Sequence, residues 1–226
     1  MPTDSPLHIY EKAMLLILKD EEGIVGVSYC DLALAGAILS ELFLDERLTV
    51  EGEKNLVRVK DASSTGDALL DECLELIERA STARPLQKCL TEIAALSELK
   101  HRIARGLCRR GILREDEGKV LLFFTRRIYP EVDPGPEDAL VAELTEAIFT
   151  DTDEVSPHVA ALIALGNGVG LLNGTFPRKD LRQRRERLEA IARGDVGTVS
   201  QAAAAAREAI EAAMLVCVIV PAACST

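Results

Sequence analysis

Apolar residues recur at helical spacing along most of this sequence, and they limit the folds that are open to it. In the segment from Cys30 to Leu44, apolar residues follow the three- and four-residue intervals that place side chains on one helical face. Aromatic residues make up 4% of the chain and tryptophan is absent, so the core must consist of Leu, Ala, Ile and Val. This composition favours helices over a β-sandwich.

The same periodicity predicts helices elsewhere, and two alternating segments predict β-hairpins. The expected helices cover 7–18, 30–44, 86–110 (as one or two helices), 137–149, 157–172 and 199–220, and a further helix starts within 63–72. The expected hairpins cover 47–61 and 112–125, and the second turns at 115–118. With no internal repeat or low-complexity linker, we expect one mainly α domain over 1–226. It is a helical bundle with one or two small β-hairpins, and residues 1–6 form a flexible tail.

The stretch SSTGDALLDE, from Ser63 to Glu72, resembles a phosphate-binding loop that leads into a helix. A nucleotide-binding loop of this type would carry a lysine after its last glycine, but Gly66 is followed by Asp67, whose charge repels phosphate. Ser64 and Asp67 have the spacing of a capping box. We therefore predict that the stretch starts a helix with Ser64 as its cap.

Catalytic and metal-binding patterns are not found in the sequence. The three histidines are far apart, and neither an H-E-x-x-H nor a G-x-S-x-G motif occurs. The glycine-rich GNGVGLLNG, Gly166 to Gly174, follows a segment of helical length rather than a strand, so we assign it to close helix packing. We expect no enzymatic activity, no metal and no cofactor.

Cysteine usage and hydropathy suggest a cytoplasmic protein. None of the six cysteines forms a C-x-x-C pair, which is typical of free, buried thiols in a reducing compartment. The first residues are polar and acidic rather than like a signal peptide. The longest apolar run, AAMLVCVIVPAA, is too short for a bilayer span of about 20 residues.

The charge distribution excludes one class of partner and leaves another open. A net charge of -11 argues against nucleic acid, which is bound through cationic groups. Two basic clusters depart from this average, one from Ser97 to Pro130 and one from Arg178 to Arg187. Each is either a solvated helix face or a surface for phosphate head groups or an acidic partner.

Seven segments, in order, resemble the Golgi phosphoprotein 3 family from about Leu7 through the expected last helix. They are LHIYEKAMLLILKDEEG, LALAGAILSELFLDERL, STGDALLDE, KHRIARGLCRRGIL, VLLFF, RIYPEVDP and ALIALGNGVGLLNGTF. The resemblance implies a helical domain that binds phosphatidylinositol 4-phosphate at a membrane surface, and a β-hairpin used for self-association or membrane contact. Eukaryotic members retain glycosyltransferases in the Golgi by binding their cytosolic tails and the coat.

The resemblance thus implies a non-catalytic peripheral membrane adaptor that binds an anionic lipid head group and cytosolic tails of membrane proteins. The alternative is a cytosolic protein-interaction module of the same fold that has lost lipid binding. The family's head-group pocket has a tryptophan and three arginines. In this sequence the tryptophan position falls near residues 26–28, where Tyr29 is the neighbouring aromatic residue. The three arginine positions fall on Ala35, Ser97 and Lys100. We assign the head-group site to Tyr29, Ser97 and Lys100 and expect weakened binding.

The second predicted hairpin carries the consecutive apolar residues Leu121, Leu122, Phe123 and Phe124. Because strand side chains alternate between faces, both faces are apolar and one needs an additional cover. Three carboxylates at the predicted turn, residues 115–117, would be repelled by an anionic bilayer. We therefore expect a homo-oligomer formed through the 112–125 hairpin.

Overall fold

The computed structural model describes residues 5–19, 27–51, 56–79, 83–120 and 124–196, together with 212 and 214. The helices are α1 (Ile9–Lys19), α2 (Val27–Leu44), α3 (Ala68–Glu78), α4 (Leu86–Ala94), α5 (Leu99–Arg109), α6 (Gly135–Phe149), α7 (Pro157–Val169), α8 (Leu172–Thr175), α9 (Arg178–Gln183) and α10 (Arg185–Ala192). The strands are β1 (Leu48–Glu51), β2 (Leu56–Val59), β3 (Arg84–Pro85), β4 (Asp116–Val120) and β5 (Phe124–Ile128). The expected mainly α fold with small hairpins is confirmed.

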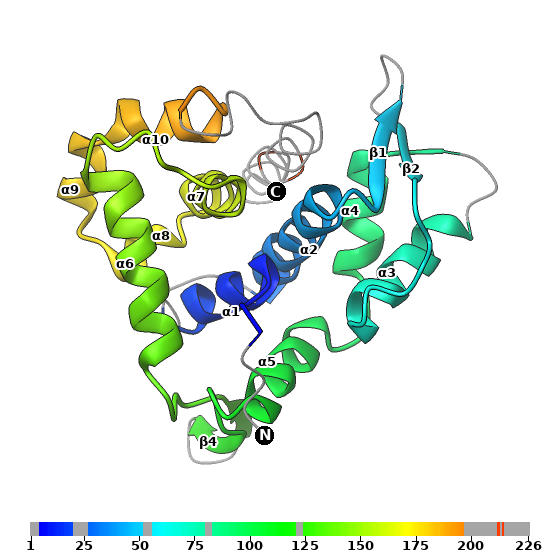
Figure 1. Ribbon diagram of the computed structural model, residues 1–226. Coiled ribbons are helices and arrows are strands. Elements are labelled where there is room, and N and C mark those ends of the chain that lie inside the picture. Colours follow the sequence, from blue (N-terminus) through cyan, green and yellow to red (C-terminus); the bar gives the residue numbers. More distant parts are fainter. Residues whose placement is uncertain are drawn as a thin grey trace, which may run out of the picture.

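Helix α2 lies at the centre of the molecule, between α1, α4, α5 and α7 (Figure 1). Its fully buried apolar residues are Ala33, Leu34, Ala35, Ala37, Ile38, Leu39, Leu42 and Phe43. A helix that is apolar on all sides is stable only when neighbours cover every face. Burial of Glu41 in this helix is therefore costly unless its carboxylate is paired.

Helix α3 begins where the sequence predicted a helix, but with a different cap. Asp67 is the N-cap, and its Oδ1 accepts hydrogen bonds from the backbone N–H groups of Leu69 and Leu70. Ser64 instead donates its hydroxyl to Asp71, so the prediction of Ser64 as the cap was wrong. The Asp67 carboxylate also accepts a bond from the buried Tyr10 on α1, 3.0 Å away. A carboxylate suits this position because the N-terminus of a helix is partly positive.

The first hairpin is confirmed, with β1 and β2 antiparallel and Leu48 opposite Val59. The short strand β3 joins β2 as the third strand of this sheet. Strand β3 was not predicted from the sequence, because two residues are too few to produce an alternating pattern.

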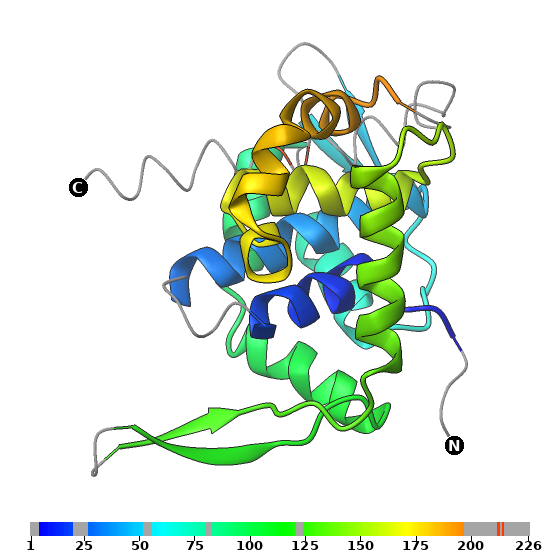
Figure 2. The same ribbon diagram turned by 90° about the vertical axis from the view of Figure 1, so that its left-hand side faces the viewer.

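The second hairpin has a different register from the predicted one. Strand β4 contains three residues of the predicted turn, 116–118, and pairs them with 126–128 of β5. Glu117 therefore lies opposite Arg127, and opposite charges across a strand pair favour this register. Ile112 and Leu113 are buried in the domain rather than part of the hairpin. Figure 2 shows the hairpin projecting from the helical body.

The chain after α6 differs from the expectation in two ways. Ser156 caps α7 and Pro157 is its first residue, as predicted, but the helix ends at Val169 because Gly170 adopts a left-handed φ of 81°. The basic segment after α8 forms α9 and α10, which were not predicted. The expected last helix, 199–220, lies outside the described residues except for 212 and 214, which are helical.

The described cysteines form no disulfide: Cys30, Cys73 and Cys89 are buried and Cys108 is half-buried. Burial raises the pKa of Cys73 to about 12 and that of Cys89 to about 11, so both stay protonated and unreactive. The expected flexible tail falls partly outside the described residues, which begin at Ser5. The carbonyl of Ser5 accepts a bond from the Arg110 side chain, so the start of the described chain is held against the domain.

Candidate functional site

Two regions are candidates: the assigned head-group residues and a cleft between helices. Tyr29 lies in the first turn of α2, and its side chain is outside the described part. Ser97 is exposed in the turn before α5, and Lys100 is half-buried in the first turn of α5. Asp31 connects α2 to α5, because its carboxylate accepts a hydrogen bond from the backbone N–H of Lys100. The structure thus brings the first turns of α2 and α5 close together.

The charges around Lys100 do not favour a phosphate. Burial raises the pKa of Asp31, and this effect outweighs the hydrogen bond and positive charge of Lys100, which lower it. The neighbouring cations already contact carboxylates. Arg105 and Arg127 both bind Glu98, at 3.2 and 2.7 Å, and these bonds lower the pKa of Glu98.

The assigned oligomer residues are only partly described. Leu121, Leu122 and Phe123 lie outside the described residues, and Phe124 opens β5 with its side chain also outside. The observed register moves the carboxylates of 116 and 117 into β4. The prediction that carboxylates at the turn would keep the hairpin away from an anionic bilayer was therefore wrong, because Asp116 and Glu117 do not lie at the turn.

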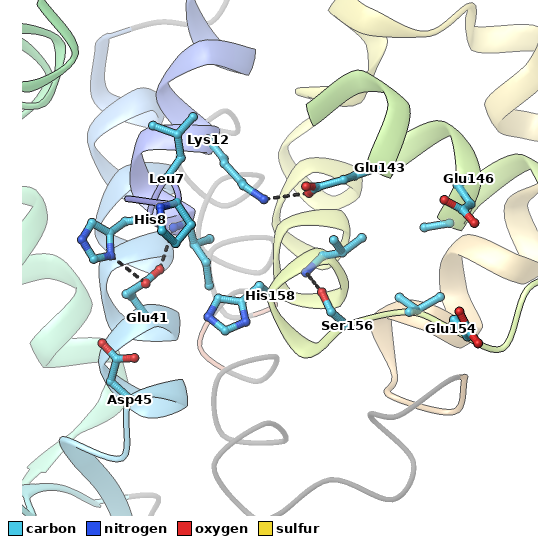
Figure 3. Close-up of a pocket in the computed structure, with 15 residues that line it drawn as sticks. Leu7, His8, Lys12, Glu41, Asp45, Glu143, Glu146, Glu154, Ser156 and His158 are labelled. Atoms are coloured by element: carbon cyan, nitrogen blue, oxygen red, sulfur yellow. Dashed lines mark hydrogen bonds and ion pairs between the residues drawn. The ribbon is translucent and has the colours of Figure 1, made fainter. Parts of the chain in front are cut away.

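A cleft of about 580 Å³ lies among the start of α1, the end of α2, α6 and the start of α7 (Figure 3). Its carboxylates are Glu41, Asp45, Glu143, Glu146 and Glu154, and its basic side chains are Lys12, His8 and His158. Lys12 crosses the cleft and contacts Glu143 at 2.7 Å. Because the five carboxylates outnumber the three basic side chains, the cleft favours a cationic ligand.

Glu41 is the most buried acid of this cleft, with 6% of its side chain exposed. Its two oxygens accept hydrogen bonds from the backbone N–H of Ile9, at 2.6 Å, and from His8 Nδ1, at 2.8 Å. It therefore caps the first turn of α1 from the neighbouring helix. The bond to Glu41 raises the pKa of His8, and this outweighs the opposing effect of burial.

The opposite wall of the cleft is formed by the start of α7. The Ser156 hydroxyl accepts a bond from the backbone N–H of Val159 at 3.3 Å and is thus used as a helix cap. Figure 3 shows His158 facing the cleft from α7. Within the described ranges, no cluster of three His, Cys, Asp or Glu residues is arranged to hold a metal ion.

This cleft was not predicted from the sequence. Its residues are scattered between Pro6 and Val159, and the spacing within one helix does not reveal which helices meet. The one signal was Glu41 itself, an acidic residue within the apolar run of α2. No helix in the described ranges has both the length and the hydropathy needed to cross a bilayer.

Comparison with known proteins identifies the family. The profile described as Golgi phosphoprotein 3 (GPP34) matches residues 9–213. A relative, vacuolar protein sorting-associated protein 74 of Eremothecium gossypii, is 30% identical over 216 residues. The alignment covers 79% of this chain and 64% of the relative, so the chain spans less than two thirds of that protein's length. Because the profile match includes every described helix and strand, the chain belongs to the Golgi phosphoprotein 3 (GPP34) family.

Proposed function

We propose that this protein is a non-catalytic peripheral membrane adaptor that holds a cationic segment of a partner protein in the cleft. The observation that carries the proposal is the excess of carboxylates in a cleft large enough for several side chains. The name of the Eremothecium gossypii relative associates that protein with vacuolar protein sorting. A role in sorting suits an adaptor whose ligand is the cytosolic tail of a membrane protein, because such tails are commonly rich in lysine and arginine.

Membrane attachment in this proposal uses an anionic head group at the first turns of α2 and α5, and phosphatidylinositol 4-phosphate is the candidate. Lys100 supplies the positive charge there, and Ser97 and Tyr29 complete the site. Each charge-assisted contact to a phosphate contributes roughly 1.5–3 kcal/mol. With a single lysine beside Asp31, the affinity is weak, and binding to a membrane depends on several copies acting together.

Self-association through the hairpin is part of the same proposal. The run from Leu121 to Phe124 is apolar, and a second subunit would remove it from water. Oligomers multiply weak head-group contacts, so self-association and weak lipid binding support each other.

Vesicle flotation tests the lipid contact. Phosphatidylcholine vesicles with and without phosphatidylinositol 4-phosphate are mixed with the parent, with Lys100→Ala and with Arg109→Ala. Arg109 lies on the same helix and is exposed, so it is a control of equal charge change. We expect the parent to float with the phosphoinositide, and Lys100→Ala to lose more binding than Arg109→Ala. Equal loss in both variants would remove Lys100 from the site.

Peptide binding tests the cleft. A fluorescent peptide rich in lysine and arginine is titrated with the parent and with a Glu143→Gln/Glu146→Gln variant. The control is Glu51→Gln/Glu75→Gln, which removes two exposed carboxylates elsewhere on the protein. We expect a clear loss of affinity only in the cleft variant. Peptide binding without any flotation would favour the alternative, a protein-interaction module that does not bind lipid.

A further inference from the structure

A second groove, of about 730 Å³, lies between the end of α7 with α8 and the pair α9 and α10. Figure 2 looks onto the side of the molecule that carries α8 and α9. The charged residues that line the groove are Arg178, Arg182, Arg185 and Glu189. The groove therefore carries a formal charge of about +2 on a chain whose net charge is -11.

The arginines of the basic segment from Arg178 to Arg187 form two groups in the structure, and those of the first group stabilise the fold. Arg184 donates to the carbonyls of Ile148 and Thr150 and pairs with Asp151. Arg187 likewise donates to carbonyls at the end of α6 and just beyond it. Both satisfy carbonyl groups at the C-terminus of α6, where cations are favoured.

The second group faces the groove and has no such structural role. Arg178 and Arg182 are exposed, and neither contacts a carboxylate within the described part of the chain. Among the described residues, Arg182 donates only to the carbonyl of Arg178, at 3.3 Å. Arg185 pairs with Glu189 at 2.7 Å in an exposed contact, which contributes little and is easily exchanged for another anion.

The opposite wall offers polar groups and little steric bulk. Asn167 and Asn173 line it from α7 and α8, together with Gly166 and Gly170. Asn173 is oriented by a bond from its side-chain amide to the Gly170 carbonyl, 2.9 Å. The C-terminus of α7 contributes about half a negative charge, which leaves the groove positive overall.

We propose that this groove is a second anion site, separate from the Lys100 region, and that it binds a phosphomonoester. Guanidinium groups match the terminal oxygens of a phosphate in paired, charge-assisted hydrogen bonds, and several arginines can share one phosphate. Asn167 is exposed across the groove and can donate to the remaining oxygens. The phosphomonoester belongs either to a lipid head group or to a soluble ester such as an inositol phosphate.

Two probes distinguish these sources: soluble inositol monophosphate, and phosphatidylcholine vesicles that contain phosphatidylinositol 4-phosphate. Each is titrated against the parent, Arg178→Gln/Arg182→Gln, Arg193→Gln/Arg79→Gln and Lys100→Gln. Arg193 and Arg79 are exposed arginines outside the groove, so their double variant matches the charge change. Because each lost phosphate contact weakens binding about tenfold or more, we expect a loss of about 100-fold in the groove variant. Thermal melting of each variant verifies folding.

Each outcome has a defined meaning. Binding of the soluble ester that is lost only in the groove variant supports the site and a soluble ligand. Vesicle binding alone, with the same loss, supports the site and a lipid ligand. Equal loss in the groove variant and the Arg193/Arg79 control, or no binding of either probe to the parent, overturns the inference. Loss in Lys100→Gln with an unaffected groove variant overturns the second site and leaves the proposed adaptor function intact.

Discussion

Replacing Glu41 with glutamine tests whether this buried carboxylate holds α1 to α2 and controls the charge of His8. Glutamine keeps an oxygen that can accept the bond from the Ile9 backbone N–H but loses the negative charge. Alanine removes both functions. The pair of variants therefore separates the capping role of Glu41 from its electrostatic role.

The structure gives the expected size of each effect. In Glu41→Ala, the buried N–H of Ile9 is left without a partner, which costs about 1–3 kcal/mol, and the lost side-chain packing adds about 1 kcal/mol. The His8 contact is worth about 1 kcal/mol, because His8 is one-third exposed and solvent screens the pair. Glu41→Ala should therefore cost about 3–5 kcal/mol of unfolding free energy below neutral pH, and Glu41→Gln about 1 kcal/mol.

The electrostatic contribution of Glu41 to the unfolding free energy depends on pH in a defined direction. The Glu41 contact raises the pKa of His8 above its ordinary value of 6.5. The stabilisation from the His8–Glu41 contact is therefore fully present below pH 6.5 and is lost as the pH rises through the higher pKa of His8 in the folded state. His101, whose pKa is lowered mainly by burial, has the opposite effect. The decisive quantity is therefore the difference in unfolding free energy between parent and variant at each pH, rather than the pH dependence of the parent alone.

Urea unfolding followed by circular dichroism, from about pH 5 to about pH 9, measures this difference. We expect the difference in unfolding free energy between the parent and Glu41→Gln to shrink as the pH rises. The difference between the parent and His8→Gln should shrink in the same way. A difference in unfolding free energy that stays constant across this pH range would refute the His8–Glu41 ion pair. A gap that widens with pH would show that the sign of the argument is wrong.

Three further outcomes are expected. Asp67→Ala should lower the unfolding free energy by about 2 kcal/mol, since it removes a helix cap and the partner of the Tyr10 hydroxyl; Ser64→Ala should cost less than about 1 kcal/mol in the same urea assay. Arg187→Gln should cost about 1–3 kcal/mol, because carbonyls at the end of α6 lose their donor, and a thermal melt unchanged from the parent would contradict this. Leu122→Asp should shift a sedimenting oligomer toward monomer; a parent that is already monomeric, with a variant that loses vesicle binding, would indicate lipid contact instead.

Local patterns were sufficient to predict most helices. Helix α2 was expected over 30–44 and covers Val27–Leu44, because the spacing of apolar side chains within one helix depends only on the helix itself. The start of α7 was predicted for the same reason, since Ser156 and Pro157 act on the adjacent turn. The close packing assigned to the glycine-rich segment also holds at Gly166, where an added Cβ would lie 3.1 Å from Leu172.

Features that depend on distant partners were predicted poorly. The hairpin register was misplaced, because a turn-like acidic stretch is locally as acceptable as the observed pairing of Glu117 with Arg127. The cap of α3 was assigned to Ser64, whereas Asp67 also receives the hydroxyl of Tyr10, 57 residues away in sequence. In both cases a partner on another strand or helix is involved, and the local pattern does not reveal it.

The amino-acid sequence by itself determined that the chain is helical, acidic overall and basic in two segments. The tertiary structure alone decided what those charges do. Arg184 and Arg187 contact the end of α6, whereas Arg178 and Arg182, in the same basic run, face an open groove. The acids that line the cleft come from the end of α2 and the residue after it, from α6 and from the segment before α7, and the fold brings these parts together. The physical reason is that a charge acts through its neighbours in space, and the packing of α2 against its partners decides which neighbours those are.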